Sequence, residues 1–210
     1  MKLVTQEVIG RDQCITTRWS GGTTTEWKIY PPGASYAERR FDWRLSTAVL
    51  EDEHSSFTRL DGFSRTLLLL SGKCRLTHHG HYKKNLRPLQ MSRFPGSWET
   101  ESDGSGSDLN LMVGPKVLGH LKVLSLRRAL RHRPKLPFGA KGQLFELYYT
   151  VRGSCVVDFG ELQKSVSTDT CLYTAWSAET GSNATLRFEP DRGGVTLVYA
   201  RMYVLAAGEK

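Results

Sequence analysis

The sequence predicts an all-β protein with a sandwich or barrel architecture. Apolar residues occur in short runs that alternate with polar residues, and clusters of Gly, Pro, Ser and Asp separate these runs. No stretch keeps a 3.6-residue apolar stripe over three helical turns, so helices are not expected to dominate. Many short strands at this spacing are typical of sandwiches and barrels.

The order of the expected strands follows from the turn residues between them. The strands cover residues 26–30, 43–50, 65–70, 73–77, 109–113, 121–126, 144–151, 155–159, 170–175, 184–188 and 195–205. The turns are marked by Pro31-Pro32-Gly33, Asp61-Gly62, His79-Gly80-His81, Pro95-Gly96, Asp103-Gly104-Ser105-Gly106, Phe159-Gly160 and Arg192-Gly193-Gly194. Residues 118–130 also fit a basic helix, although the centre of this stretch, 122–126, suits a strand equally well.

The chain of 210 residues is long enough for one large all-β domain or two small ones. Each half contains a strand, a glycine turn and a second strand, LLLLSGKCRL at 67–76 and LYYTVRGSCVV at 147–157, about 80 residues later. This repeat predicts two joined barrels. We expect an N-terminal barrel with the candidate pocket over residues 1–120, a basic linker or connecting strand over 121–140, and a C-terminal barrel packed on the first over 141–210.

The formal net charge of +8 is local rather than spread over the chain. Cationic residues gather in one basic tract, which consists of Arg127, Arg128, Arg131, Arg133 and Lys135. Because no Phe, Tyr or Trp is interleaved with them, we interpret the tract as a solvated linker, with phosphate contact as the alternative.

Three features predict a cytoplasmic protein. The N-terminal residues MKLVTQE contain no apolar segment of the kind found in signal peptides. The longest aliphatic run, 67–70, is far shorter than the roughly 20 residues that span a bilayer. The cysteines are scattered without a C-x-x-C pair, which is typical of thiols in a reducing compartment rather than of disulfide frameworks or zinc sites.

Two of the expected strands carry a polar face opposite an apolar face. Alternation over 42–49 places these residues on one face: Asp42, Arg44, Ser46 and Ala48. Alternation over 108–113 does the same for Asp108, Asn110 and Met112. These faces could meet water on the outside of an antiparallel sheet, or they could line the mouth of a barrel and orient a ligand.

Further side chains are candidates for the same site. Arg65 begins an apolar stripe, so its guanidinium could bind a carboxylate at the end of that stripe or pair with Asp61. Thr24 and Glu26 share a face after the glycine turn in 19–26, and they could add a hydroxyl and a carboxylate to a site or lie exposed on a hairpin. The glycine turn lacks the spacing of a phosphate-binding loop.

No metal site and no catalytic centre are expected. His78, His79 and His81 lie at a turn without a following Glu at metal-binding spacing, which favours a surface hairpin tip. The chain has no G-x-S-x-G motif, no Cys with an evident His partner and no pair of carboxylates spaced for acid/base chemistry. We therefore expect no cofactor, and a binding protein rather than an ordinary enzyme.

Five ordered segments between residues 19 and 112 carry a family resemblance. They are WSGGTTTE at 19–26, FDWRLSTA at 41–48, the set Phe57, Gly62 and Arg65 ahead of LLLLSG at 67–72, FPG at 94–96, and DLNLM at 108–112. Together they resemble the HutD/Ves family of double cupins. The C-terminal half is similar only as a generic series of cupin-like strands, and Ser20 stands where many relatives have Asn.

The resemblance implies an RmlC-like double-stranded β-helix, arranged as a bicupin that lacks the usual metal ligands. It also implies an association with histidine utilisation or stress response, and a pocket for a small carboxylate related to urocanate or formylated glutamate. The candidate pocket residues are Thr24, Glu26, Arg44, Ser46, Arg65, Asp108 and Asn110.

The expected function is therefore metal-free binding of a small anionic metabolite, through which the protein senses or moderates a catabolic pathway. One alternative is a metal-independent isomerase or hydrolase that acts on a small polar metabolite. Another is a nucleic-acid-binding regulator that uses the basic tract. No membrane partner is expected, and a homodimer is one candidate oligomeric state.

Overall fold

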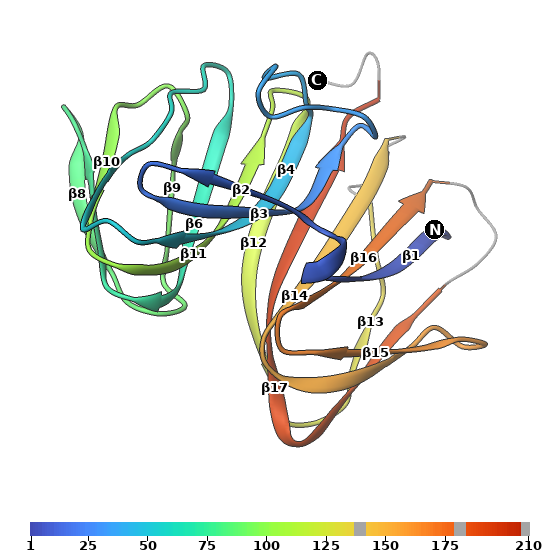
Figure 1. Cartoon of the computed structure of the whole chain (residues 1–210). Coiled ribbons are helices and arrows are strands. Elements are labelled where there is room, and N and C mark those ends of the chain that lie inside the picture. Colours follow the sequence, from blue (N-terminus) through green and yellow to red (C-terminus); the bar gives the residue numbers. More distant parts are fainter. Residues whose placement is uncertain (137–141, 179–183, 207–210) are drawn as a thin grey trace. The chain divides into compact units, whose positions relative to one another are not determined.

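The computed structural model describes residues 1–136, 142–178 and 184–206. Its regular elements are β-strands apart from a short 3-10 helix, η1 (Arg11–Gln13), which confirms the predicted all-β class (Figure 1). In these ranges, no helix has the length and apolar character needed to cross a membrane. The strands form two compact units, Cys14–Val117 and the combination of Met1–Gln13 with Leu118–Lys210.

The unit Cys14–Val117 contains two antiparallel sheets. The six-stranded sheet has the order β2-β3-β4-β11-β6-β9, and its strands are β2 (Ile15–Trp19), β3 (Gly22–Tyr30), β4 (Trp43–Leu50), β11 (Gly106–Val113), β6 (Ser64–Gly72) and β9 (Met91–Pro95). The four-stranded sheet has the order β5-β10-β7-β8, and its strands are β5 (His54–Ser56), β10 (Thr100–Asp103), β7 (Cys74–His78) and β8 (Tyr82–Leu86).

Apolar side chains from both sheets form the core of this unit. Leu67, Leu69 and Phe94 of the six-stranded sheet pack with Cys74, Leu76 and Leu86 of the four-stranded sheet. The chain passes from β6 into β7 at Gly72, whose φ is 81°. A Cβ there would collide with the carbonyl oxygen of Ser105, so this crossing requires glycine. The predicted sequence of strand, glycine turn and strand is confirmed here.

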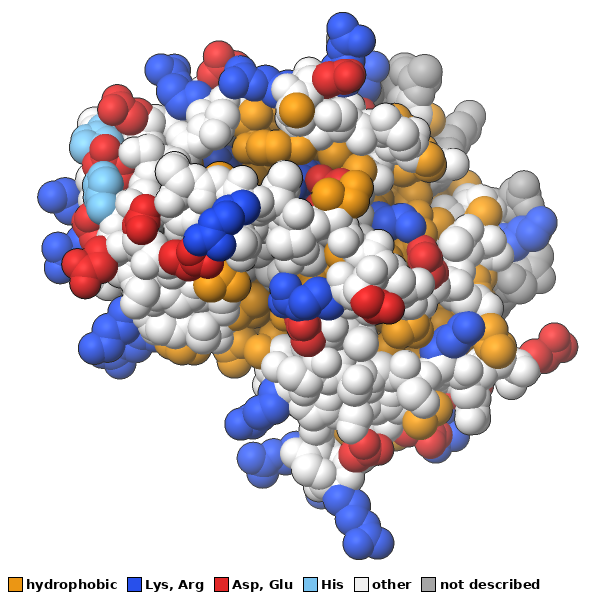
Figure 2. All heavy atoms as spheres, viewed as in Figure 1, with side chains coloured by type: hydrophobic (Ala, Val, Ile, Leu, Met, Phe, Trp, Pro, Cys, Tyr) orange, Lys and Arg blue, Asp and Glu red, His pale blue; other side chains and the backbone are white. Residues whose placement is uncertain are grey.

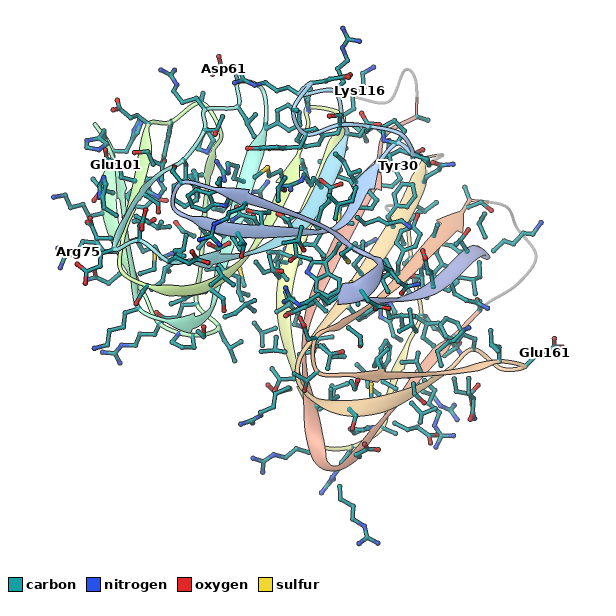
Figure 3. The ribbon with its side chains drawn as sticks, in the orientation of Figure 1. Tyr30, Asp61, Arg75, Glu101, Lys116 and Glu161 are labelled. Atoms are coloured by element: carbon teal, nitrogen blue, oxygen red, sulfur yellow. The ribbon has the colours of Figure 1, made fainter. Side chains whose placement is uncertain are left out.

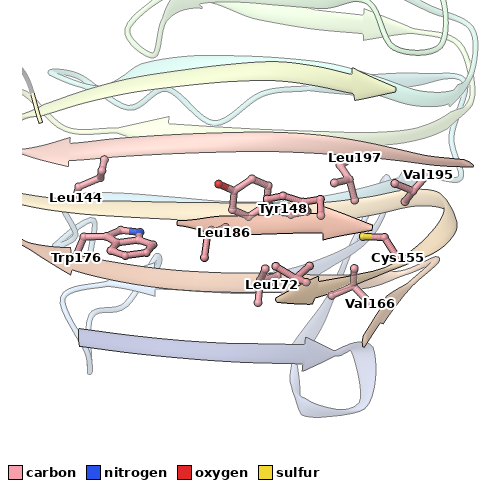
Figure 4. Close-up of a cluster of buried hydrophobic side chains, with 11 residues drawn as sticks. Leu144, Tyr148, Cys155, Val166, Leu172, Trp176, Leu186, Val195 and Leu197 are labelled. Carbon is pink, nitrogen blue, oxygen red and sulfur yellow. The ribbon is translucent and has the colours of Figure 1, made fainter. Parts of the chain in front are cut away.

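The second unit is built on one seven-stranded sheet with the order β1-β16-β14-β17-β12, in which β13 also pairs with β17 and β15 with β14. Its strands are β1 (Lys2–Gly10), β12 (Val117–Leu126), β13 (Leu130–His132), β14 (Gln143–Asp158), β15 (Gln163–Ser167), β16 (Thr170–Ser177) and β17 (Leu186–Val204). The core lies on the strands β14 to β17, with Tyr148, Leu172, Trp176 and Leu186 among its buried side chains (Figure 4).

Two long strands replace pairs of shorter ones expected from the sequence. The expected strands 144–151 and 155–159 are one strand, β14, which contains Gly153 with a φ of 84°. The expected strands 184–188 and 195–205 are likewise parts of β17. The expected turn at Arg192-Gly193-Gly194 is therefore wrong, because these residues lie within β17. The pairing register between β14 and β17 shifts next to Gly153, as at a β-bulge.

The boundaries of the units differ from the expected N-terminal barrel over 1–120. Residues 1–13 belong with the C-terminal strands, because β1 pairs with β16 from Lys2 opposite Ser177 to Gly10 opposite Thr170. The boundary between the units falls after Val117. Residues 117–126 form the strand β12, so the helical alternative for 118–130 is wrong.

Candidate functional site

The strand register brings the predicted site residues onto one face of the six-stranded sheet. Met112 of β11 lies opposite Arg44 of β4 and opposite Arg65 of β6. Two residues away along β11, Asn110 lies opposite Ser46 of β4. Because side chains alternate along each strand, these five residues point to the same side of the sheet.

The same face continues onto β3. Glu26 lies opposite Ser46, and Thr24 lies opposite Ala48, which in turn faces Asp108 of β11. The seven predicted residues thus come from the four neighbouring strands β3, β4, β11 and β6.

This polar face is buried. Arg44, Ser46, Arg65, Asp108 and Asn110 are each no more than 6% exposed. The alternative that these side chains meet water on the outside of the sheet is therefore wrong. Charged side chains are rarely buried without partners or a binding role, so their contacts decide what this face can do.

A cavity of about 450 Å³ lies over the face. Its lining includes six of the predicted residues: Thr24, Arg44, Ser46, Arg65, Asp108 and Asn110. Glu26 does not line the cavity but contacts Arg44. The rest of the wall comes from the β2–β3 hairpin, the loop before β4, the strands β4 and β11, and the segment around β5. Its members are Thr17, Arg18, Trp19, Ser20, Tyr36, Ala48, Leu50, Ser55, Ser56, Phe57, Thr58 and Met112.

Arg44 is held by an ion pair and an aromatic ring. Its Nε donates to Oε2 of Glu26 at 2.6 Å, and its Nη1 donates to Oγ of Ser46 at 3.0 Å. Its guanidinium carbon lies 4.4 Å from the ring centroid of Tyr36, within the range of a cation–π contact. The positive charge of Arg44 is therefore largely matched by Glu26.

Arg65 makes weaker polar contacts. Its Nη1 donates to the carbonyl of Thr58 at 3.2 Å, and its Nη2 donates to Oδ1 of Asn110 at 3.4 Å. Its guanidinium carbon lies 4.8 Å from the ring centroid of Phe57. The buried Nε has no hydrogen-bond partner within the described ranges. Burial lowers the pKa of Arg65 to about 10, so the guanidinium stays protonated at neutral pH.

The alternative role of Arg65, an ion pair with Asp61, is also wrong. Asp61 is exposed and its side chain points outward at the surface (Figure 3). Arg65 instead points into the cavity that Asn110 and Asp108 share with it.

Asp108 is a buried carboxyl group, and no ion pair between it and a guanidinium occurs among the described residues. Its Oδ1 accepts a hydrogen bond from Nδ2 of Asn110 at 2.8 Å, and the side chain is 1% exposed. Burial raises the pKa of Asp108 to about 6, although the Asn110 hydrogen bond and the charge of Arg65 oppose this shift. The carboxyl can therefore gain or lose a proton near neutral pH.

Aromatic residues at the cavity wall were not predicted as site residues. Trp19 donates from Nε1 to Oγ1 of Thr24 at 3.0 Å, which fixes the indole at the rim. Tyr36 lies in the segment between β3 and β4, where no strand pattern points to either face of a sheet. Among these aromatic residues, Trp19 and Phe57 belong to segments that carry the family resemblance, which was the signal that could have pointed to them.

The residues present do not fit the metal site that many cupins carry. His78 is buried with Nδ1 2.9 Å from Oγ1 of Thr100, whereas the ring of His81 stacks on Trp98. His79 contacts Glu101 at 2.8 Å. Figure 2 shows histidine side chains beside acidic side chains on the molecular surface. No group of three or more His, Cys, Asp or Glu side chains in the described ranges is placed to hold a metal ion.

Solved structures similar to this chain have cupin-like folds. The conserved protein of unknown function PA5104 from Pseudomonas aeruginosa PAO1 is 20% identical, with a TM-score of 0.78 over 95% of this chain and 99% of that one. HutD from Pseudomonas fluorescens SBW25 is 21% identical, with a TM-score of 0.69 over the same shares. Oxalate decarboxylase from Lactobacillus farciminis is 9% identical, with a TM-score of 0.57 over 98% and 88%.

Because these identities are low, the similarity to solved structures establishes only the fold of this chain. No match was found among curated proteins. The sequence model of the HutD family matches residues 11–190, which is most of the chain and includes every predicted site residue. The chain therefore belongs to the HutD family.

Proposed function

We propose that this protein binds a small carboxylate, without a metal ion, in the cavity of the unit Cys14–Val117. The observation that carries the proposal is Arg65, a buried cation that lines the cavity with an Nε lacking a partner among the described residues. A carboxylate oxygen is the acceptor best suited to such a donor, because charge-assisted hydrogen bonds are stronger than neutral ones. Arg44 and Asn110 add further donors on the same wall.

The role of this binding is to sense or moderate a catabolic pathway such as histidine utilisation, in the cytoplasm. Support comes from membership of a family that includes HutD of Pseudomonas fluorescens, whose structure was solved in a formate condition. We also propose that the two units are the barrels of a bicupin. Support for an internal duplication comes from the two similar segments at 67–76 and 147–157, each of which contains a glycine with positive φ: Gly72 at 81° and Gly153 at 84°.

Calorimetric titration against urocanate, formylglutamate, formate and acetate tests the binding proposal. We expect at least one of these acids to bind, and Arg65→Met to weaken its binding about 10- to 100-fold, which corresponds to one charge-assisted hydrogen bond of about 1.5–3 kcal/mol. Arg75→Met is the matched control, because Arg75 is exposed on β7 and contacts Asn85 outside the cavity. Failure of all four acids to bind, or unchanged affinity of a folded Arg65→Met variant, would contradict the proposal.

The pathway role needs a separate experiment. A strain of the source organism that lacks this gene is grown on histidine, and histidine-pathway enzyme levels are measured. Complementation with the wild-type gene should restore normal levels, whereas the Arg65→Met gene should not. Normal levels in the deletion strain on histidine would contradict a role in that pathway.

One observation favours a metal-independent enzyme as a second candidate. A carboxyl group with a pKa near 6 can act as a general acid or base at neutral pH, and Asp108 has this property within the cavity. Incubation of the protein with each bound acid, followed by chromatography, discriminates the two functions. Turnover that is lost in Asp108→Asn would favour the enzyme.

A further inference from the structure

We propose that the cavity takes up its carboxylate ligand together with one proton, and that Asp108 holds this proton. The inference rests on the proposed carboxylate binding and adds the charge state that the site accepts. It follows from the balance of buried charges and from the contacts of each carboxyl group.

The charges on and beside the cavity wall already cancel when every group is ionised. Arg44 and Arg65 supply two positive charges, and Glu26 and Asp108 supply two negative charges. Arg18 at the rim is exposed and pairs with Glu51 at 2.7 Å, so its charge is matched elsewhere. A ligand carboxylate would add an unmatched negative charge to a buried site, which costs several kcal/mol.

Asp108 is the carboxyl group that can accept a proton at the lowest cost. Glu26 is held directly by a guanidinium at 2.6 Å, and protonation would break that ion pair. Asp108 accepts instead from the neutral amide of Asn110. The ion pairs of the described residues include none with Asp108, although Arg65 and Asp108 both contact Asn110.

The groups around Asp108 leave no other site for the proton. On β6, Arg65 is already protonated. On β7, burial raises the pKa of Cys74 to about 12, and Asp108 itself adds to this shift, so the thiol is already neutral. On β4, Asp108 faces Ala48, and the nearest charged residue of that strand, Arg44, is paired with Glu26. Among these groups, Asp108 is therefore the one that titrates near neutral pH.

Proton uptake makes the affinity depend on pH in a defined direction. The protonated form of Asp108 is the binding-competent form, and its share falls as the pH rises above about 6. The apparent Kd is the intrinsic Kd divided by that share. From pH 5.5 to pH 7.5 the apparent Kd should therefore rise about 25-fold for a ligand that stays ionised over this range.

The experiment is calorimetry with sodium formate at constant ionic strength, at pH 5.5, 6.5 and 7.5. Each pH is measured in two buffers of different ionisation enthalpy, so that the protons taken up can be counted. Formate stays ionised throughout, because carboxyl pKa values lie near 4. The wild-type protein should take up about one proton per formate at pH 7.5 and show the 25-fold change in affinity.

Two variants test whether Asp108 holds the proton that is taken up on binding. Asp108→Asn keeps an acceptor for Asn110 and imitates the neutral carboxyl, so it should bind formate at pH 7.5 about as tightly as the wild type does at pH 5.5, without proton uptake. Asp103→Asn removes an exposed acid that contacts His54 outside the cavity and should keep the wild-type pH dependence.

The outcomes separate the two proposals. Formate binding with no proton uptake in the wild type would overturn the proton coupling and leave the carboxylate site standing. Proton uptake that persists in Asp108→Asn would overturn the assignment to Asp108. If formate and the other three acids all fail to bind at pH 5.5, both proposals are refuted. The wild-type proton count decides the coupling even if Asp108→Asn does not fold.

Discussion

Replacing Arg44 by Met should destabilise the protein through the carboxylate that it leaves behind. Glu26, whose side chain is 18% exposed, would lose its partner at 2.6 Å, and the cation–π contact with Tyr36 would also be lost. Removing one partner of a fully buried ion pair costs about 3–5 kcal/mol. Because solvent reaches part of Glu26, we expect a smaller loss of about 2–3 kcal/mol.

The assay is thermal unfolding of the wild type, Arg44→Met, Glu26→Gln and the double variant. For a chain of this size, the expected loss lowers the Tm of Arg44→Met by about 5–10 °C. The double variant leaves no unpaired charge, so it should recover at least half of that loss, which appears as a favourable coupling energy in the cycle. A double variant no more stable than Arg44→Met would refute the reasoning, as would a Tm of Arg44→Met equal to that of the wild type.

Further predictions follow from burial and backbone geometry. Neutralising the basic tract Arg127–Lys135 should change the free energy of unfolding by less than about 0.5 kcal/mol, because its cationic residues are exposed, and a large fall in Tm would contradict this. The pKa of Asp108 is raised to about 6 in the folded protein, above the value of about 3.9 for unfolded Asp. The protonated carboxyl therefore stabilises the folded protein at low pH, and this stability is lost as the pH rises from about 4 to 6. Asp108→Asn should thus raise the Tm at pH 7.5 but not at pH 4, and equal effects at both values would count against the shift. Gly72→Ala should destabilise the protein by at least about 2 kcal/mol more than Gly33→Ala, because both residues have positive φ but only Gly72 faces a backbone carbonyl, and chemical denaturation compares them.

Alternation along β4 and β11 made the candidate site predictable in part. Period two correctly placed Arg44 with Ser46, and Asp108 with Asn110, because both strands lie inside the sheet and keep a regular register. The same alternation occurs on solvent-facing sheets, so it could not tell a buried polar face from an exposed one. That distinction depends on which strands cover the face, and the contact between Arg44 and Glu26 depends on pairing between β3 and β4.

Several strands had no periodic signal that could have predicted them. The residues of β2 and β8 are mostly exposed, so no apolar face selects their sequence. They are held by pairing to β3 and β7 through backbone hydrogen bonds, which any residue except Pro can make. The turn expected at 192–194 failed for a related reason, because glycines also mark irregularities within long strands such as β17.

The pairing of β1 with β16 has a consequence for the order in which the protein is synthesised. Strand β1 requires a partner that ends at Ser177, whereas the unit Cys14–Val117 is continuous in the chain. At 5–20 residues per second, synthesis of the intervening segment takes about 10–30 s. During that interval the unit that carries the cavity can fold from its own strands. Strand β1 meanwhile lacks its native neighbour, so it cannot join its sheet until β16 has been synthesised.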